Sequence, residues 1–382
     1  MAAKRRHRQR PRPPFLAKEL RPPREVTRDL YLVWRSPRIG QGNPHRLSNP
    51  VWTWLARATE LSAYQANQHF EGPSSMGVGP AWCCSRFGQS STTLADGRVV
   101  RIAGEHEDHY DPDFFIYNDV IVEDRAGGIH IYGYPYDVFE PTDFHSATLV
   151  GDDVVVIGNL SYPVRRRPGQ TPVVRLDTRT FEMHPMKTEG TPPGWVHGHE
   201  ATLSADGRAI IVTGGKLAIE RDGERTLMDS PDEWSLDVGS FRWTRLTERR
   251  WEQWELRRED GRGNELWRLD MAMQYGMVHE RLDRSLFKGL GDPKAVLEKR
   301  PLHESRYSPP VPHEKLPDSE DFPRVLRRIV EGVVVRYVEE SFDVSIVVEG
   351  TLPREVVDTI VEDACRKLGE LEGTRYTKQR VT

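Results

Sequence analysis

The fold is decided by residues 145–158, which read HSATLVGDDVVVIG. Two runs rich in apolar residues flank a Gly-Asp turn, which is typical of two antiparallel β-strands joined by a tight turn. Similar stretches occur at 90–104, SSTTLADGRVVRIAG, and at 199–215, HEATLSADGRAIIVTGG. Equivalent leucines of the three stretches are 55 and 54 positions apart. A repeat of about 50 residues that begins with paired strands is typical of β-propeller blades.

The second half of each unit continues this pattern. Residues 172–183 and 233–244 have the form of a third strand, a turn with an aspartate and a fourth strand, and residues 114–133 match more loosely. At these residues the sequence resembles kelch repeats of the galactose-oxidase type and uncharacterised bacterial kelch-like proteins, over residues 84 to about 247. The resemblance implies a mainly β fold, a kelch-like β-propeller that is incomplete or irregular because three units are fewer than a closed ring needs.

The three units depart from the kelch pattern at several positions. Only the third has a full diglycine, Gly214-Gly215, and Ser90 stands where the second and third units have His145 and His199. Cys83-Cys84 lacks the partner residues that a copper-radical oxidase needs, so the resemblance concerns the fold and its chemistry is not carried over. We expect His145 and His199 to hydrogen-bond neighbouring backbone, with metal binding as the alternative.

The composition excludes several classes of protein. A chain of 382 residues is long enough for two to three domains with a sizeable core. The mean hydropathy of −0.63 and the absence of a long apolar run predict no membrane span. The first residues are basic and proline-rich instead of apolar, which argues against a secretory signal. Three cysteines make a poor disulfide framework, so we expect a cytoplasmic protein.

Six segments are expected along the chain. They are a disordered basic tail (1–29), an N-terminal strand and helix that cap the repeats (30–83), the kelch-like repeats (84–250), a helical extension (251–300), a linker (301–323) and a small α+β domain (324–382). Within these segments we expect a strand at 30–34, helices at 49–68, 251–256, 264–277 and 325–330, strands at 333–338 and 342–348, and a helix at 353–370.

The loop expected at residues 105–113 contains the densest group of candidate functional side chains in the sequence. Seven of its nine residues have side chains that ligate cations. Imidazole and carboxylate ligands suit a divalent metal such as zinc, iron or manganese, and the candidates are His106, Glu107, His109 and Asp111. The alternatives are a solvated loop or a binding surface without metal, for which the candidates are Glu105, Asp108, Tyr110 and Asp113.

The corresponding loop of the second unit is basic. It carries Tyr162, Arg165, Arg166 and Arg167. If the units stack, this loop opens on the same face as the acidic one, and the two loops pair with each other or the arginines hold an anionic ligand. Asp143 and Glu200 are candidates for an acid/base couple with an aspartate of the acidic loop.

Three functions follow from these features. The first is an interaction or scaffold protein that binds a protein or a small polar ligand through loops 105–113, 159–170 and 216–231. The second is a hydrolase or lyase in which the His and carboxylate cluster holds a divalent metal that activates water. The third is attachment to nucleic acid through the basic residues 4–12. The sequence does not decide whether the protein is an enzyme.

Overall fold

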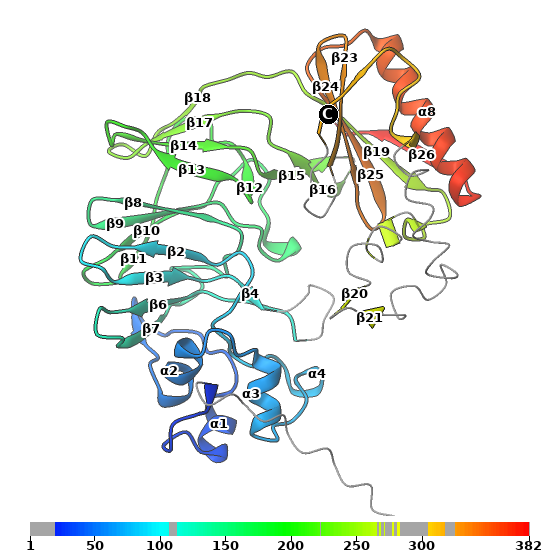
Figure 1. The fold of residues 1–382 in the computed structure, drawn as a ribbon. Helices are drawn as coiled ribbons and strands as arrows, with labels where there is room; N and C mark the ends of the chain where they lie inside the picture. The colour runs from blue at the N-terminus through cyan, green and yellow to red at the C-terminus, as the bar shows by residue number, and fades with distance from the viewer. Residues whose placement is uncertain are drawn as a thin grey trace, which may run out of the picture. The chain divides into compact units, whose positions relative to one another are not determined.

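In a computed structural model, the chain divides into two units, Met1–Thr247 and Glu248–Thr382, which we describe separately. The structure describes residues 20–106, 113–221, 223–265, 267–268, 271, 277–278, 281–282, 305–317 and 325–381. The fold is mainly β, as the sequence predicts, with several antiparallel sheets (Figure 1). Among the described residues, no sheet closes into a barrel. No helix in this part of the chain is long and apolar enough to cross a membrane.

The first unit contains three successive antiparallel sheets. Each sheet has four strands from one repeat, and the first sheet has β1 as an additional strand. The first sheet has the order β1-β7-β6-β3-β2, the second β11-β10-β9-β8 and the third β13-β14-β17-β18. Their strands are β1 (His45–Arg46), β2 (Ser90–Thr93), β3 (Val99–Ile102), β6 (Asp119–Glu123), β7 (Ile129–Gly133), β8 (Ser146–Val150), β9 (Asp153–Ile157), β10 (Val173–Asp177), β11 (Met183–Pro185), β13 (Glu200–Leu203), β14 (Ala209–Thr213), β17 (Trp234–Asp237) and β18 (Trp243–Arg245). The predicted pairing of strands within each unit is therefore present.

Successive sheets are joined at their first strands, β2, β8 and β13. β8 lies beside both β2 and β13. Nε2 of His145, just before β8, lies 2.8 Å from the Ser90 hydroxyl of β2, and Nε2 of His199, just before β13, lies 2.8 Å from the Ser146 hydroxyl of β8. The expectation of a backbone partner for these histidines is wrong, because each one bonds a serine side chain of the preceding sheet.

The two ends of these sheets differ in construction. At one end the strands are joined by short turns, in which Asp96, Asp124, Asp177, Asp206 and Asp237 each accept backbone N–H groups that follow them. Backbone hydrogen bonds are the main cause that lowers the pKa of Asp96, Asp124 and Asp177. For Asp206 and Asp237, hydrogen bonds from the Ser204 and Ser240 side chains lower the pKa most, and the backbone N–H groups add to the effect. We call this the Asp-turn end. At the opposite end, the long-loop end, the connections are longer and contain further strands, which project from the sheets in Figure 1.

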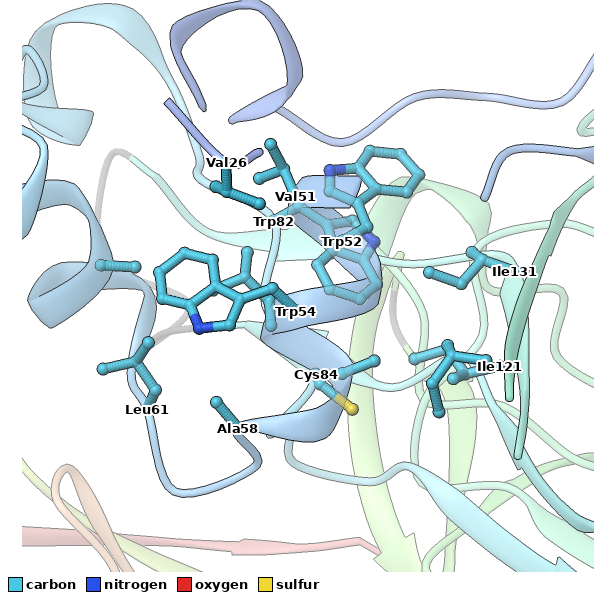
Figure 2. Close-up of a cluster of buried hydrophobic side chains, with 14 of the residues drawn as sticks. Val26, Val51, Trp52, Trp54, Ala58, Leu61, Trp82, Cys84, Ile121 and Ile131 are labelled. Carbon is cyan, nitrogen blue, oxygen red and sulfur yellow. The ribbon is translucent and has the colours of Figure 1, made fainter. Parts of the chain in front are cut away.

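The N-terminal segment is helical. Its helices are α1 (Arg28–Trp34), α2 (Pro50–Arg57), α3 (Ala63–His69) and α4 (Ser75–Val78). Helix α2 packs against strand β7 of the first sheet, and α1 packs on α2. Figure 2 shows their core, in which Trp52 of α2 stacks on Trp82 at a ring distance of 4.9 Å and meets Ile121 and Ile131 of the sheet. Val26, in the segment expected to be a disordered tail, is buried in the same core; residues 1–19 lie outside the described part.

Two predictions for this helical segment need correction. Residues 30–34 form helix α1 instead of a strand, because the Thr27 side chain caps the first turn by accepting the N–H of Leu30. The helix predicted over 49–68 begins at Pro50 after its Asn49 cap, as expected, but ends at Arg57. A new helix then begins after Ser62, which forms a capping box with Gln65.

The second unit is a sheet with one long helix. Its order is β22-β23-β24-β25-β19-β26. The elements are β19 (Glu252–Arg258), β22 (Glu314–Lys315), β23 (Val325–Val330), β24 (Val333–Glu339), β25 (Asp343–Glu349), α8 (Arg354–Glu372) and β26 (Tyr376–Arg380), with a separate hairpin of β20 (Met277–Val278) and β21 (Arg281–Leu282). The strands predicted at 333–338 and 342–348 and the helix at 353–370 are confirmed.

Helices predicted at 251–256 and 325–330 are wrong, because both segments are strands of this sheet. In β23, Leu326, Arg328 and Val330 are buried on one face. The charged residue in the middle of that face hides the alternation of apolar and polar residues that identifies a strand. Of the predicted linker 301–323, the structure describes residues 305–317, and Tyr307 among them is buried in the core of the unit.

Candidate functional site at the long-loop end

Connections from all three sheets build the long-loop end. The loop after β3 contains a hairpin of β4 (Glu105–His106) and β5 (Phe115–Ile116), and the loop after β9 contains the short 3-10 helix η2 (Pro163–Arg165). Strands β15 (Lys216–Arg221) and β16 (Glu224–Asp229) follow β14 and pair with β12 (Trp195–His197) in a three-stranded sheet. These segments contain the described parts of the three loops that the sequence predicts as a binding surface.

Direct contacts tie these connections together. The Tyr162 hydroxyl accepts a hydrogen bond from the Ile116 backbone N–H at 3.0 Å, and its ring meets Phe114 edge-on at 5.7 Å. Arg225 of β16 donates to the Pro163 carbonyl at 2.9 Å. Burial raises the pKa of Tyr162. Tyr162, a predicted binding residue, therefore links two loops in the folded chain.

One buried carboxyl group, Asp143, contacts the loop after β9. Asp143 is fully buried and accepts the Ser161 backbone N–H at 2.7 Å. Burial raises the pKa of Asp143, and hydrogen bonds from Ser161 and Glu105 together with the charge of Arg166 oppose that rise. Glu200, predicted as a partner of Asp143, is exposed instead on β13.

The three arginines of the basic loop have different environments. Arg166 donates to the carbonyls of Leu160 and Ser161 at 2.9 and 3.2 Å, and Arg167 forms an ion pair with Glu140 at 2.5 Å. Arg165 lies over the Tyr136 ring, with 5.2 Å from its guanidinium carbon to the ring centre. Arg166 and Arg167 thus stabilise the loop itself, while the half-buried Arg165 packs against Tyr136.

Of the four predicted metal ligands, the structure describes only His106, which is buried; Glu107, His109 and Asp111 lie outside the described residues. Of the binding residues predicted in the same loop, Asp108 and Tyr110 also lie outside the described residues. Glu105 and Asp113 are described, and Asp113 is buried. Within the part of the chain that the structure describes, no group of three or more His, Cys, Asp or Glu side chains is arranged to hold a metal ion.

His106 instead contacts a cysteine. Its Nδ1 lies 3.2 Å from the Cys83 sulfur, and both residues are buried. Burial lowers the pKa of His106 to about 4, and Asp113 and Arg86 shift it in opposite directions by smaller amounts. The imidazole is therefore neutral at pH 7.

Other buried histidines near this end are also neutral. Burial lowers the pKa of His145 and His197 to about 3 and that of His199 to about 4. His145 and His199 form their hydrogen bonds to serine hydroxyls as neutral imidazoles. Because Nε2 of each ring is hydrogen-bonded within the protein, we assign these repeat-equivalent histidines a structural role.

The exposed part of the surface lies on η2. Val164 is 85% exposed, the largest exposed fraction among the exposed large apolar side chains of the described residues, and Arg165 follows it in the helix. Arg225, from a different connection, is also exposed and holds the backbone of η2. Sequence reasoning named Arg165 but missed Val164 and Arg225. The sequence signal for Val164 was its position between a proline and three arginines. No local feature of the sequence marks Arg225.

Comparisons with known proteins give limited information. No family model and no curated protein matches the sequence. A solved structure described as "Structure of YjhT" is similar over 42% of this chain and 55% of that chain, with 15% sequence identity and a TM-score of 0.33. The chain therefore matches about half the length of that protein. A TM-score of this size assigns neither a family nor an activity.

Proposed function

We propose that this protein is an interaction protein that binds a segment of a partner protein on its long-loop end. In this proposal the three successive sheets are blades of an incomplete kelch-like propeller, and η2 is the centre of the contact surface. The observation that carries the proposal is the exposed Val164 on a short helix whose backbone is fixed from several sides.

The contrast between the two ends supports this choice. Carboxylates at the Asp-turn end accept hydrogen bonds from backbone N–H groups of their own turns. The long-loop end is more elaborate than chain connection alone requires, since a hairpin, a 3-10 helix and a three-stranded sheet are inserted there. Loops held by a rigid sheet scaffold are where binding residues are usually found.

The rigidity of η2 favours binding without a large loss of conformational freedom. Its backbone carbonyl at Pro163 is held by Arg225, and the chain before it is held by Arg166. A side chain presented on a fixed backbone loses less entropy on association than one on a mobile loop. Val164 therefore combines exposure with preorganisation.

The chemistry of the surface indicates the kind of segment bound. Val164 offers an apolar contact, and Arg165 and Arg225 add positive charge close to it. Guanidinium groups pair well with carboxylates. The partner segment that fits has an apolar side chain next to an acidic residue.

Photo-crosslinking from position 164 tests the proposal. We expect a crosslinker placed at 164 to capture a defined protein from source cells, and a crosslinker at Arg179, 71% exposed at the Asp-turn end, not to capture it. The captured protein, once purified, should bind Val164→Glu at least about tenfold more weakly than the parent and bind Arg179→Glu unchanged. Equal binding to all three proteins would refute the proposed surface.

A further inference from the structure

We propose that the outer edge of strand β26 binds an extended, acidic segment of a partner protein, which adds to the sheet as a further strand. This edge belongs to the second unit, so the proposal does not depend on the function proposed for the long-loop end. In the sheet order β22-β23-β24-β25-β19-β26, β26 is the last strand and, among the described strands, pairs with β19 alone. It packs beside α8 (Figure 1).

The register with β19 shows which backbone groups of β26 face outward. The N–H of Val381 donates to the Gln253 carbonyl at 2.7 Å, in line with the register of the two strands. Backbone groups that face a partner strand alternate along an antiparallel strand, so those of Thr377 and Gln379 also face β19. The N–H and C=O groups of the intervening residues point to the outer edge, and these residues are Tyr376, Lys378 and Arg380.

This outer edge is accessible. Residues 377–380 are exposed, and no hydrogen bond between described residues uses the outward-facing backbone groups. An N–H donor and a carbonyl acceptor from each of these residues are therefore available to a further strand. Exposed strand edges are templates for pairing with another chain, and peptides that bind by strand addition use such edges.

A groove next to the first residues of β26 gives an added segment room for side chains. It has a volume of about 650 Å³ and is lined by the end of α8, from Cys365 to Glu370, and by residues 373–376. A Cβ at Gly369 would lie 2.7 Å from the Thr374 carbonyl oxygen, so glycine allows the chain to turn back closely along the helix. Alternate side chains of an added strand point to the helix side of the sheet, where this groove lies.

Charge favours an acidic occupant. Residues 375–380 read RYTKQR and contain three cations and no acid. Lys378 and Arg380 form ion pairs within the unit, whereas the exposed Arg375 has no ion-pair partner among the described residues. Guanidinium groups pair well with carboxylates. A second copy of β26 would instead bring like charges together across the new pair of strands, which is destabilising.

Titration of the full-length protein with a fluorescein-labelled peptide of about seven residues, alternating threonine and glutamate, tests the proposal. We expect saturable binding, and no binding of the same peptide with lysine in place of glutamate. Methylation of the backbone nitrogens of alternate residues should abolish binding for one of the two alternate sets and spare it for the other, because only one set faces β26. No saturable binding, or the same effect of both methylation patterns, would overturn the proposal without the need for a variant.

A pair of variants locates the binding at this edge. Lys378→Pro removes an outward N–H and leaves the hydrogen bonds to β19 intact, and Lys378→Thr removes the same charge but keeps the N–H. We expect Lys378→Pro to bind the peptide at least about tenfold more weakly than Lys378→Thr, with similar thermal unfolding of the two proteins. Equal binding by two folded variants would contradict the assignment. A dimer that sedimentation detects in the parent and not in Lys378→Pro would assign the edge to a second copy instead.

Discussion

Acid sensitivity of the histidines that join the sheets is the most quantitative consequence of the fold. His199 is buried, its Nε2 lies 2.8 Å from the Ser146 hydroxyl, and burial lowers its pKa from 6.5 to about 4. The unfolded chain therefore takes up a proton near pH 6.5, while the folded chain does so only near pH 4. The free energy of unfolding must fall as the pH decreases through this window.

The magnitude follows from these two pKa values. Between pH 6.5 and pH 5 the unfolded state binds about one more proton than the folded state at His199, which lowers the free energy of unfolding by about 2 kcal/mol. His145 and His197, with pKa values of about 3, each add a similar loss over the same range. The three histidines lower the stability in the same direction, and the loss at His199 alone is a large fraction of the total stability of a typical domain.

Two variants separate the titration from the hydrogen bond. His199→Gln should reduce the loss of stability between pH 7 and pH 5 by about 2 kcal/mol, because the titrating group is gone. Ser146→Ala should lower the stability at pH 7 by about 1 kcal/mol and keep the full pH dependence, because the imidazole remains buried. Urea unfolding at both pH values measures these differences, and hydrogen exchange at β8 and β13 assigns the transition to the first unit. A His199→Gln protein with the same pH dependence as the parent would refute the reasoning.

Further predictions concern the backbone, the acidic loop and the tail. Gly158 has φ +78°, and a Cβ there would lie 2.4 Å from the Val196 carbonyl oxygen; Gly158→Ala should therefore lower the thermal unfolding temperature much more than Gly151→Ala, whose site is open. The divalent-metal interpretation predicts near-stoichiometric metal in protein purified without chelator and its loss in His106→Ala/His109→Ala; metal-free parent protein would exclude it. The nucleic-acid interpretation predicts binding that weakens steeply with salt and is lost on deletion of residues 4–12; binding that survives the deletion would contradict it.

The repeat was readable from the sequence because its signals are local. Alternating apolar residues, Asp-containing turns and glycines at strand ends specify paired strands without knowledge of the rest of the chain. The Asn49 cap and the apolar stripe of α8 are local signals of the same kind. Prediction failed where a distant partner decides the conformation: β19 is a strand because β25 and β26 flank it.

The candidate site was predicted less completely, because it depends on contacts between loops. The sequence indicated that the acidic and basic loops share one end. It did not show that Glu105 interacts with Asp143, or that Arg167 forms an ion pair with Glu140. The contact between Cys83 and His106 has no sequence signature, since no spacing rule relates the two residues. Contacts of this kind are fixed by the packing of successive strands.

Hydrogen exchange with and without the partner captured through position 164 tests the central claim most directly. The proposed function predicts slower exchange of backbone amides at residues 158–172 and 214–221 in the complex, with unchanged exchange at the aspartate turns around Asp96 and Asp177. Protection at those turns, or only within the second unit, would contradict the assignment of binding to the long-loop end.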